Sequence, residues 1–188
     1  MANPAIEEAV RVLKDGGVIL YPTDTVWGIG CDATNQQAVE RVFAIKQRAE
    51  SKALVLLACD LDMVARYVRE IPPMAIDLVE VNDAPMTIIY PGAQLLAPGV
   101  VAADGSVGIR IPMSEHCRQL AYRLRRPVVS TSANISGEPT PKRFKDISEA
   151  IRGAVDYIVS PKLEAESTGK ASQIIKLAVD GTVEIIRP

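Results

Sequence analysis

Short apolar runs of strand length recur along this chain, and helical patterns separate most of the early ones. Each run holds four or five residues, is rich in Val, Ile and Leu, and is bounded by Gly, Pro or polar residues, as buried strands are. The runs before residue 132 lie at 18–21, 53–57, 86–90, 107–111 and 127–131. Such alternation requires a sheet joined by helical connections, which restricts the chain to folds that combine strands and helices.

The last third of the chain departs from this alternation. Strand candidates at 157–159, 172–177 and 183–187 follow one another, with a short helix expected at 146–152 before them. This order predicts an α/β fold with α+β-like character, built on a twisted mixed β-sheet with surrounding helices. The length of 188 residues and the absence of a composition break predict a single domain, 1–188.

Polar caps mark where helices begin. Residues 3–4, Asn followed by Pro, predict a first helix that ends at the glycines 16–17. Thr34 and Gln37 have capping-box spacing and predict a second helix that runs to about residue 46, after a Gly-bearing loop at 22–31. Further helices are expected after Asp60, Pro72 and Ser114.

Charge and cysteine content exclude several classes of protein. The formal net charge is −2, which rules out a strongly basic nucleic-acid coat but leaves room for a local basic pocket. Aromatic residues make up only 4% of the chain, too few for a platform that stacks single-stranded bases. The three cysteines have no metal-ligand spacing, and no apolar run has the length of a membrane span. A reducing cytoplasm is therefore the expected compartment.

The common nucleotide-binding motifs are missing. The chain has no Walker phosphate loop. Residues 28–33 spell G-x-G-x-x-A, but Pro22 interrupts the preceding strand, and Asp32 would place a carboxylate where a pyrophosphate should lie. We therefore do not interpret this segment as a dinucleotide fingerprint.

Hydroxyl-bearing residues follow two of the expected strands. Thr23, Asp24 and Thr25 follow the first strand, and residues 130–134 hold Ser, Thr and Asn at the end of another. Strand ends of α/β proteins often bind ligands, although such residues are also common in turns and caps. The composition alone leaves both interpretations open.

Basic residues offer a complementary signal. Lys46, Arg48 and Lys52 concentrate positive charge ahead of an apolar strand, either as a phosphate site or as a solvated face. Arg110 lies inside an apolar strand, where a cation needs a structural partner or a ligand. Together these residues favour a site for a phosphate-bearing ligand and a small zwitterion. With a single histidine, His116, no activated nucleophile is evident, so catalysis by positioning and charge stabilisation is expected.

Four blocks of the sequence resemble the YrdC/Sua5 family: residues 21–28, 46–48, 107–112 and 130–137. The resemblance implies a YrdC-like sheet around a large basic concave cavity. It also implies L-threonylcarbamoyladenylate synthase activity, which converts L-threonine, bicarbonate and ATP to threonylcarbamoyl-AMP and pyrophosphate. The product feeds the N6-threonylcarbamoyl modification of adenosine 37 in tRNA, so the enzymes that transfer this group to tRNA are implied as functional partners.

The same resemblance assigns roles to individual residues. Lys46 and Arg48 are expected to be catalytic. L-Threonine is expected to contact Thr25, Arg110, Ser130 and Ser172. The nucleotide is expected to contact Lys46, Arg48, Lys52, Ser132, Asn134, Thr140 and Arg187. Mg²⁺ is expected to arrive with ATP, held by phosphate oxygens and water rather than by a protein metal site.

The sequence departs from the family pattern in places. Ala49 replaces a frequent proline, Leu57 lies near a frequent histidine, and residues 83–87 replace a P-G-P-x-T segment. The ending at Pro188 resembles the short form of the family. Two alternatives remain: a paralogue that makes a different carbamoyl adenylate, and a module that binds double-stranded RNA. The basic rim for the RNA module would comprise Arg123, Arg125, Arg126, Lys142, Arg143 and Lys145.

Overall fold

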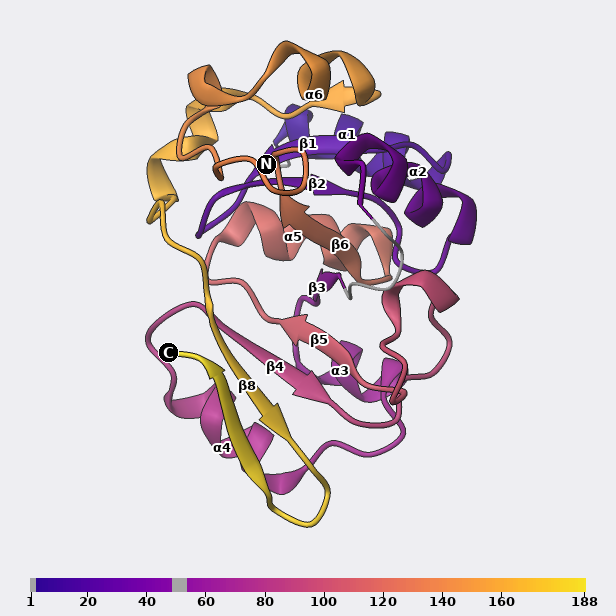
Figure 1. Ribbon diagram of the computed structural model, residues 1–188, viewed down its shortest axis with the longest axis vertical. Helices are drawn as coiled ribbons and strands as arrows, with labels where there is room; N and C mark the ends of the chain where they lie inside the picture. The colour runs from indigo at the N-terminus through magenta and orange to yellow at the C-terminus, as the bar shows by residue number, and fades with distance from the viewer. Residues whose placement is uncertain (1–2, 49–53) are drawn as a thin grey trace.

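Nine strands form the framework of the computed structural model, which describes residues 3–48 and 54–188 (Figure 1). Each of these strands holds at least one Val or Ile, residues that favour the pleated conformation. The strands are β1 (Ile19–Pro22), β2 (Trp27–Gly30), β3 (Val55–Leu57), β4 (Met86–Tyr90), β5 (Val107–Arg110), β6 (Val128–Ser132), β7 (Tyr157–Ile158), β8 (Gln173–Leu177) and β9 (Val183–Arg187).

The strands form one mixed sheet in the order β7-β1-β2-β6-β3-β5-β4-β8-β9. Three neighbouring pairs are parallel, β1 with β7, β3 with β5 and β4 with β8, and the others are antiparallel. The predicted α/β fold with a mixed sheet is confirmed. β6 lies between β2 and β3 although it follows both in sequence, so the hydroxyl-rich end of β6 comes to the middle of the sheet.

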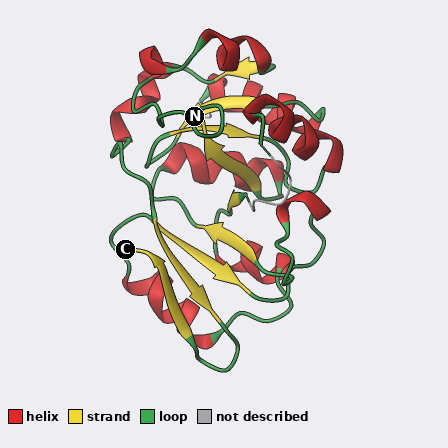
Figure 2. Cartoon of the chain, viewed as in Figure 1, coloured by secondary structure: helices red, strands yellow, loops and turns green. Residues whose placement is uncertain are grey.

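Helices surround the sheet, and Figure 2 shows several of them gathered at the end of the molecule that holds β1 and β7. The α-helices are α1 (Pro4–Lys14), α2 (Gln36–Lys46), α3 (Leu61–Tyr67), α4 (Pro73–Val81), α5 (Glu115–Leu124) and α6 (Glu149–Ala154). Short 3-10 helices occupy Pro98–Val100, Phe144–Asp146 and Pro161–Glu166. In the described part of the chain, no helix is both long and apolar enough to cross a bilayer.

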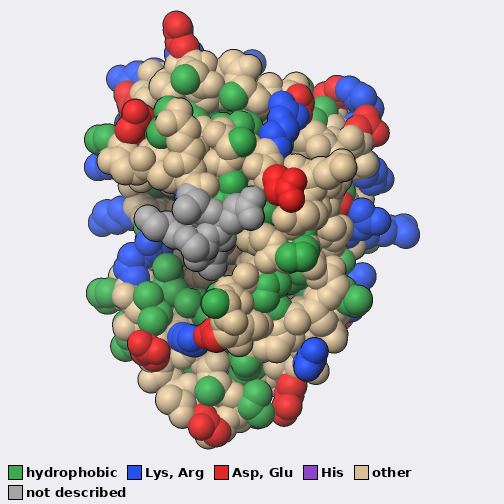
Figure 3. All heavy atoms as spheres, turned by 45° about the vertical axis from the view of Figure 1, so that its right-hand side comes forward, with side chains coloured by type: hydrophobic (Ala, Val, Ile, Leu, Met, Phe, Trp, Pro, Cys, Tyr) green, Lys and Arg blue, Asp and Glu red, His purple; other side chains and the backbone are tan. Residues whose placement is uncertain are grey.

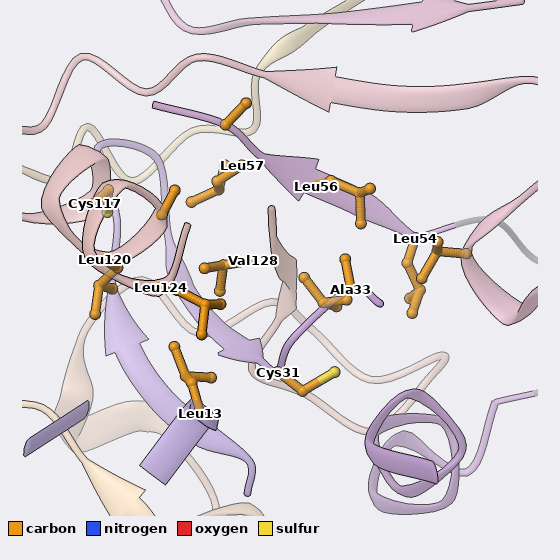
Figure 4. Packing of buried hydrophobic residues seen from close by; sticks show 14 of the residues in the cluster. Leu13, Cys31, Ala33, Leu54, Leu56, Leu57, Cys117, Leu120, Leu124 and Val128 are labelled. Atoms are coloured by element: carbon orange, nitrogen blue, oxygen red, sulfur yellow. The ribbon is translucent and has the colours of Figure 1, made fainter. Parts of the chain in front are cut away.

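The core lies between the sheet and the helices. Figure 4 shows Leu13 of α1, Leu120 and Leu124 of α5, and Val128 of β6 in one cluster with the leucines of β3. All are nearly inaccessible to solvent, and α1 and α5 pack against each other. Burial of aliphatic side chains at this density supplies most of the driving force for folding. On the outside, Figure 3 shows acidic and basic side chains interspersed over one face of the molecule.

The structure corrects the prediction of a loop over residues 22–31. Residues 27–30 form β2, which pairs with β1 on one side and β6 on the other. Gly28 and Gly30 have low strand propensity, so the sequence pattern does not predict this strand. Close packing against neighbouring strands nevertheless favours glycine at these positions. A Cβ at Gly30 would lie 2.5 Å from the Val129 carbonyl oxygen and 2.6 Å from the Tyr21 ring. Both glycines of the G-x-G-x-x-A segment therefore lie in a strand and not in a phosphate-binding turn.

Two predicted helix starts are also wrong. Asn35, not Thr34, caps α2: its side chain accepts a hydrogen bond from Ala38 N, while the Thr34 hydroxyl bonds to Asp32. The helix expected at 146–152 begins at Glu149, because the hydroxyl of Ser148 accepts from Ile151 N. Ser, Thr, Asn and Asp are all good caps, so adjacent candidates cannot be ranked from sequence.

Candidate functional site

A cavity of about 320 Å³ opens in the middle of the sheet, where β2, β6, β3 and β5 meet the C-terminal hairpin. Most of the residues predicted to form the site line it. They are Thr25, Arg48, Arg110, Ser130, Ser132, Thr140, Ser172 and Arg187. The remaining lining comprises Val26, Trp27, Gly28, Leu54, Val55, Thr131, Ala171 and Ile174.

One wall of the cavity is formed by Arg110 and the loop between β1 and β2. The Arg110 guanidinium is 3% exposed and donates to the Asp24 carboxylate through Nη1, while Nη2 lies 3.4 Å from Thr25 Oγ1. The second oxygen of Asp24 accepts from Met113 N at 2.8 Å. Arg110 therefore combines the two interpretations left open by the sequence: it has a structural partner and it lines the cavity.

Backbone contacts hold this loop from outside. The segment after the 3-10 helix at Pro161–Glu166 donates to it from Thr168 N to Asp24 O (3.0 Å) and from Gly169 N to Thr25 O (2.8 Å). His116 donates from Nε2 to Pro22 O at 2.7 Å, because a carbonyl oxygen can only accept. The single histidine thus has a structural contact behind the site and does not line the cavity.

Lys46, the last residue of α2, is buried against the end of β6. The residue is 2% exposed, and its ammonium donates to the carbonyl oxygens of Ser132 (2.5 Å) and Asn134 (2.8 Å). Burial, together with the nearby charge of Arg48, lowers the pKa of Lys46 to about 8. The residue fixes the turn at the end of β6 and is not among the cavity-lining residues.

Arg48 reaches the cavity from the turn that ends α2. Gln47 adopts a left-handed conformation with φ 51°, and Arg48 N then bonds to Phe43 O at 3.0 Å, which closes the helix end. Partial burial lowers the pKa of the Arg48 guanidinium, which carries its charge at neutral pH all the same. Lys52, predicted to act with it, lies outside the described residues, as does Ala49.

The end of β6 provides short polar groups. Ser130 and Ser132 line the cavity from this strand. Asn134 lies just beyond it, and its side-chain amide donates to Glu138 O at 2.8 Å and Ile135 O at 3.2 Å. Asn134 therefore shapes the turn that carries the loop to Thr140 and is not part of the lining.

The C-terminal hairpin closes the remaining side. Ser172, just before β8, contacts Thr87 Oγ1 through its own Oγ at 2.8 Å. Arg187 of β9 donates from Nε to Ser172 O at 2.8 Å. Residues 172 and 187 come together because β8 and β9 are antiparallel neighbours.

Two buried residues shape the site without an individual role predicted from sequence: Asp24 was named only among polar residues at a strand end, and Thr87 was not singled out. Both are polar and almost fully buried, at 4% and 1% exposure. Thr87 had a signal, because it is the one hydroxyl near the start of an otherwise apolar strand, as Arg110 is the one charge in its strand. Leu57, near the position of the family's frequent histidine, lies opposite Arg110 in the β3–β5 register and is fully buried.

The arrangement suits an anionic ligand with a polar, uncharged edge. Arg48, Arg110 and Arg187 supply charge at three places on the wall, and the hydroxyls between them can donate or accept. None of the described lining residues is a carboxylate, and both oxygens of Asp24 are occupied by N–H donors. The described residues also contain no cluster of three or more His, Cys, Asp or Glu side chains that could hold a metal ion.

Comparison with known proteins agrees with the resemblance in the sequence. The model of the Sua5/YciO/YrdC family, described as "Telomere recombination", matches residues 11–188. The threonylcarbamoyl-AMP synthase of Pseudomonas fluorescens (strain Pf-5) is 33% identical over 184 residues, covering 97% of this chain and 96% of that protein. The protein of the same name from Stenotrophomonas maltophilia (strain K279a) is 33% identical over 187 residues, with coverage of 97% and 98%.

Solved structures show the same fold. P. abyssi Sua5 complexed with L-threonine superposes with a TM-score of 0.84 at 27% identity, covering 92% of this chain and 50% of that one. E. coli YciO gives a TM-score of 0.79 at 26% identity, covering 97% and 87%. This chain spans about half the length of the P. abyssi protein and nearly all of its bacterial relatives. The chain belongs to the Sua5/YciO/YrdC family.

Proposed function

We propose that this chain is an L-threonylcarbamoyladenylate synthase, which joins L-threonine, bicarbonate and ATP and releases pyrophosphate. The observation that carries the proposal is that one cavity combines Arg110 and its hydroxyl neighbours with Arg48 and the polar end of β6. Relatives of nearly equal length carry the name threonylcarbamoyl-AMP synthase, and a structural relative is complexed with L-threonine.

In this proposal, threonine binds beside Arg110. A guanidinium has five N–H donors and pairs well with a planar carboxylate. Asp24 holds the guanidinium in place from behind, and Thr25, Ser130 and Ser172 add hydroxyls around it. Asp24 orients Arg110 and does not act as a base, because it is not among the described residues that line the cavity and its two oxygens face Arg110 and Met113 N.

The nucleotide lies toward Arg48, with Ser132, Thr140 and Arg187 as further contacts. The amine of threonine adds to CO₂ derived from bicarbonate and gives a carbamate. A carbamate oxygen then attacks the α-phosphorus, the bond from that phosphorus to the bridging oxygen breaks, and pyrophosphate leaves. Arg48 stabilises the charge that develops on the phosphates. Lys46 does not line the cavity, but it adds positive charge next to the end of β6 and holds the backbone of Ser132 and Asn134 through hydrogen bonds.

Mg²⁺ enters this proposal with ATP. The described lining offers hydroxyls and cations rather than carboxylates, so phosphate oxygens and water would supply most of the ligands. The ion's contribution is to neutralise phosphate charge.

The product is a reactive mixed anhydride, so an enzyme that transfers the threonylcarbamoyl group to tRNA must consume it soon after release. Such an enzyme is therefore a functional partner of this chain in the proposal. The proposed location is the cytoplasm, because ATP and tRNA meet there.

Incorporation of radiolabelled bicarbonate tests the proposal. The synthase predicts a labelled adenylate that requires both ATP and L-threonine, with release of one pyrophosphate for each product. Label that requires ATP but a different amino acid would indicate a paralogue. No labelled adenylate, with salt-dependent affinity for double-stranded RNA instead, would overturn the synthase in favour of the RNA-binding module. Two arginines of the basic rim expected for the RNA-binding module already pair with acidic residues. Arg126 contacts Asp32 at 2.8 Å, and Arg123 lies 3.7 Å from Glu7.

A further inference from the structure

Thr87 is a buried hydroxyl next to the site with no role in the mechanism above. It lies in β4, is 1% exposed, and places its Oγ1 2.8 Å from Ser172 Oγ. Among the described residues, Ser172 is its only hydrogen-bond partner. A buried hydroxyl that does not donate its proton leaves a donor unsatisfied, which is unfavourable. Thr87 therefore donates, and Ser172 Oγ accepts.

Arg187 acts on the same oxygen. Its Nη2 lies 3.5 Å from Ser172 Oγ, and its Nε donates to the Ser172 carbonyl oxygen at 2.8 Å. A guanidinium can only donate, so this longer contact also requires Ser172 Oγ to accept. A serine oxygen has two lone pairs and one proton. Thr87 and Arg187 face the two lone pairs, so only the hydroxyl proton of Ser172 remains available. Because Ser172 lines the cavity, it can donate this proton to a ligand there.

The sheet register sets where these residues stand. Thr87 lies opposite Arg110 in β5 and opposite Ile174 in β8, and Ile174 lies opposite Arg187 in β9. Cross-strand neighbours project from the same face of a sheet. Thr87 therefore stands between Arg110 and the Ser172–Arg187 pair, and the strands fix the spacing between the two sides.

We propose that Thr87 is a positioning residue: together with Arg187 it makes the Ser172 hydroxyl an obligate donor, directed at an anionic oxygen of the bound substrate. The inference rests on the proposed function and deepens it. The acceptor is the carboxylate of threonine, which would then receive N–H from Arg110 on one side and O–H from Ser172 on the other.

The test compares Thr87→Val, which keeps the shape but removes the donor, with Thr87→Ser, which keeps the donor. Without the Thr87 proton, one lone pair of Ser172 Oγ has no donor facing it, and the Ser172 hydroxyl is expected to rotate more freely. The KM for L-threonine should rise about 3- to 10-fold in Thr87→Val while kcat and the KM for ATP stay within about 2-fold of the wild type. Thr87→Ser should restore the wild-type KM.

Two further measurements separate this role from general loosening of β4. Because the proposed donor recognises a carboxylate, the preference of the protein for L-threonine over L-threoninamide in calorimetric binding should fall in Thr87→Val by the same factor as the KM rises. In a Ser172→Ala background, Thr87→Val should have no further effect on threonine binding, because the group it orients is gone.

Other outcomes overturn the inference. Equal losses for threonine and ATP, an unchanged preference over the amide, or an undiminished effect of Thr87→Val in the Ser172→Ala background would each contradict a donor role. An active wild type with an unaltered Thr87→Val variant would remove this inference and leave the synthase intact. A wild type that neither binds L-threonine nor makes the adenylate would overturn the proposed function, and this inference with it.

Discussion

At the scale of single residues, the geometry of the site depends on three buried charged side chains, Asp24, Lys46 and Arg110. Arg110 could be predicted from sequence as a buried cation, because it interrupts an apolar strand. Its partner Asp24 could not, since 86 residues separate the two and several other acids were available. Lys46 was predicted to contact phosphate directly, and its place beneath the end of β6 depends on a strand order that no local pattern reveals.

Asp24→Asn should weaken both the fold and threonine binding. The two oxygens of Asp24 accept from the Arg110 guanidinium and from Met113 N, and asparagine can present only one oxygen to two donors. The loss of a buried counter-charge should lower the free energy of unfolding by about 3–5 kcal/mol in urea titrations. Calorimetry should also show a loss of threonine affinity.

Asp32→Asn is the matched control for that variant. Asp32 is also buried and pairs with an arginine, Arg126, but that arginine is half-exposed and outside the cavity. This variant should lose some stability and keep its threonine affinity. Equal effects of the two variants on threonine binding would contradict the role assigned to Asp24.

Lys46→Met should change the pH dependence of stability. The folded pKa of Lys46 is about 8 and its ordinary value is 10.5, because burial and Arg48 disfavour the charge. Between these values the unfolded chain holds a proton that the folded protein has released, so stability of the wild type rises with pH. From about pH 7 to about pH 9.5, its free energy of unfolding should gain about 2 kcal/mol relative to the variant.

Denaturant titrations of both proteins at the two pH values provide the measurement. A difference that stays constant, or that moves in favour of the variant at high pH, would show that the charged form of Lys46 is not disfavoured by the fold. Shared titrations elsewhere cancel in the difference, because the two proteins differ only at this side chain.

Secondary-structure elements were predictable where their pattern is strong. Asn3 and Asp60 cap α1 and α3 as expected, since a polar cap precedes an apolar helical face in each. β2 was missed because its glycines have low strand propensity, and only the approach of β6 and the Tyr21 ring explains them. The segment at 167–169 was equally invisible, since it contacts the β1–β2 loop through the N–H groups of Thr168 and Gly169 and the hydroxyl of Ser167, which no sequence motif marks.

That segment should be sensitive to substitution at Gly169. Its φ of 72° is in the left-handed region, and its N–H donates to Thr25 O. Gly169→Ala should lower the free energy of unfolding by about 1 kcal/mol and raise the KM for threonine by about 3-fold. Thermal unfolding and steady-state kinetics measure the two effects.

Gly153→Ala in α6 is the control for this glycine. A Cβ there meets nothing within 4 Å, and alanine is the better helix former, so stability should rise by about 0.5–1 kcal/mol without a change in KM. If the two alanine variants behaved alike, the backbone conformation at Gly169 would not matter to the site.

At the scale of the whole molecule, the site depends on contacts between distant parts of the chain. The sheet places the ends of β2, β6 and β5 and the C-terminal hairpin around one cavity. Propensity and spacing could predict the strands but not their order, because β6 inserts between β2 and β3. The resemblance of four sequence blocks supplied that global arrangement, while the single-domain organisation stays a prediction.

The loop at 137–145 is expected to close over the substrates, because it carries Thr140 to the cavity and because the product hydrolyses readily. Trypsin cleavage after Lys142 and Arg143 should slow by about 5-fold or more when ATP and L-threonine are both present. Cleavage after Arg125, which does not line the cavity, should be unchanged. Cleavage of the loop that is indifferent to both substrates would contradict its role as a lid.

The central claim is that threonine and ATP occupy a single cavity in this chain. A crystal structure with L-threonine, Mg²⁺ and a non-hydrolysable ATP analogue tests it most directly. The account predicts the threonine carboxylate on Arg110 and Ser172, and the phosphates on Arg48, with the amine between the carboxylate and the α-phosphate. Ligands bound on separate surfaces, or a triphosphate away from Arg48, would contradict it.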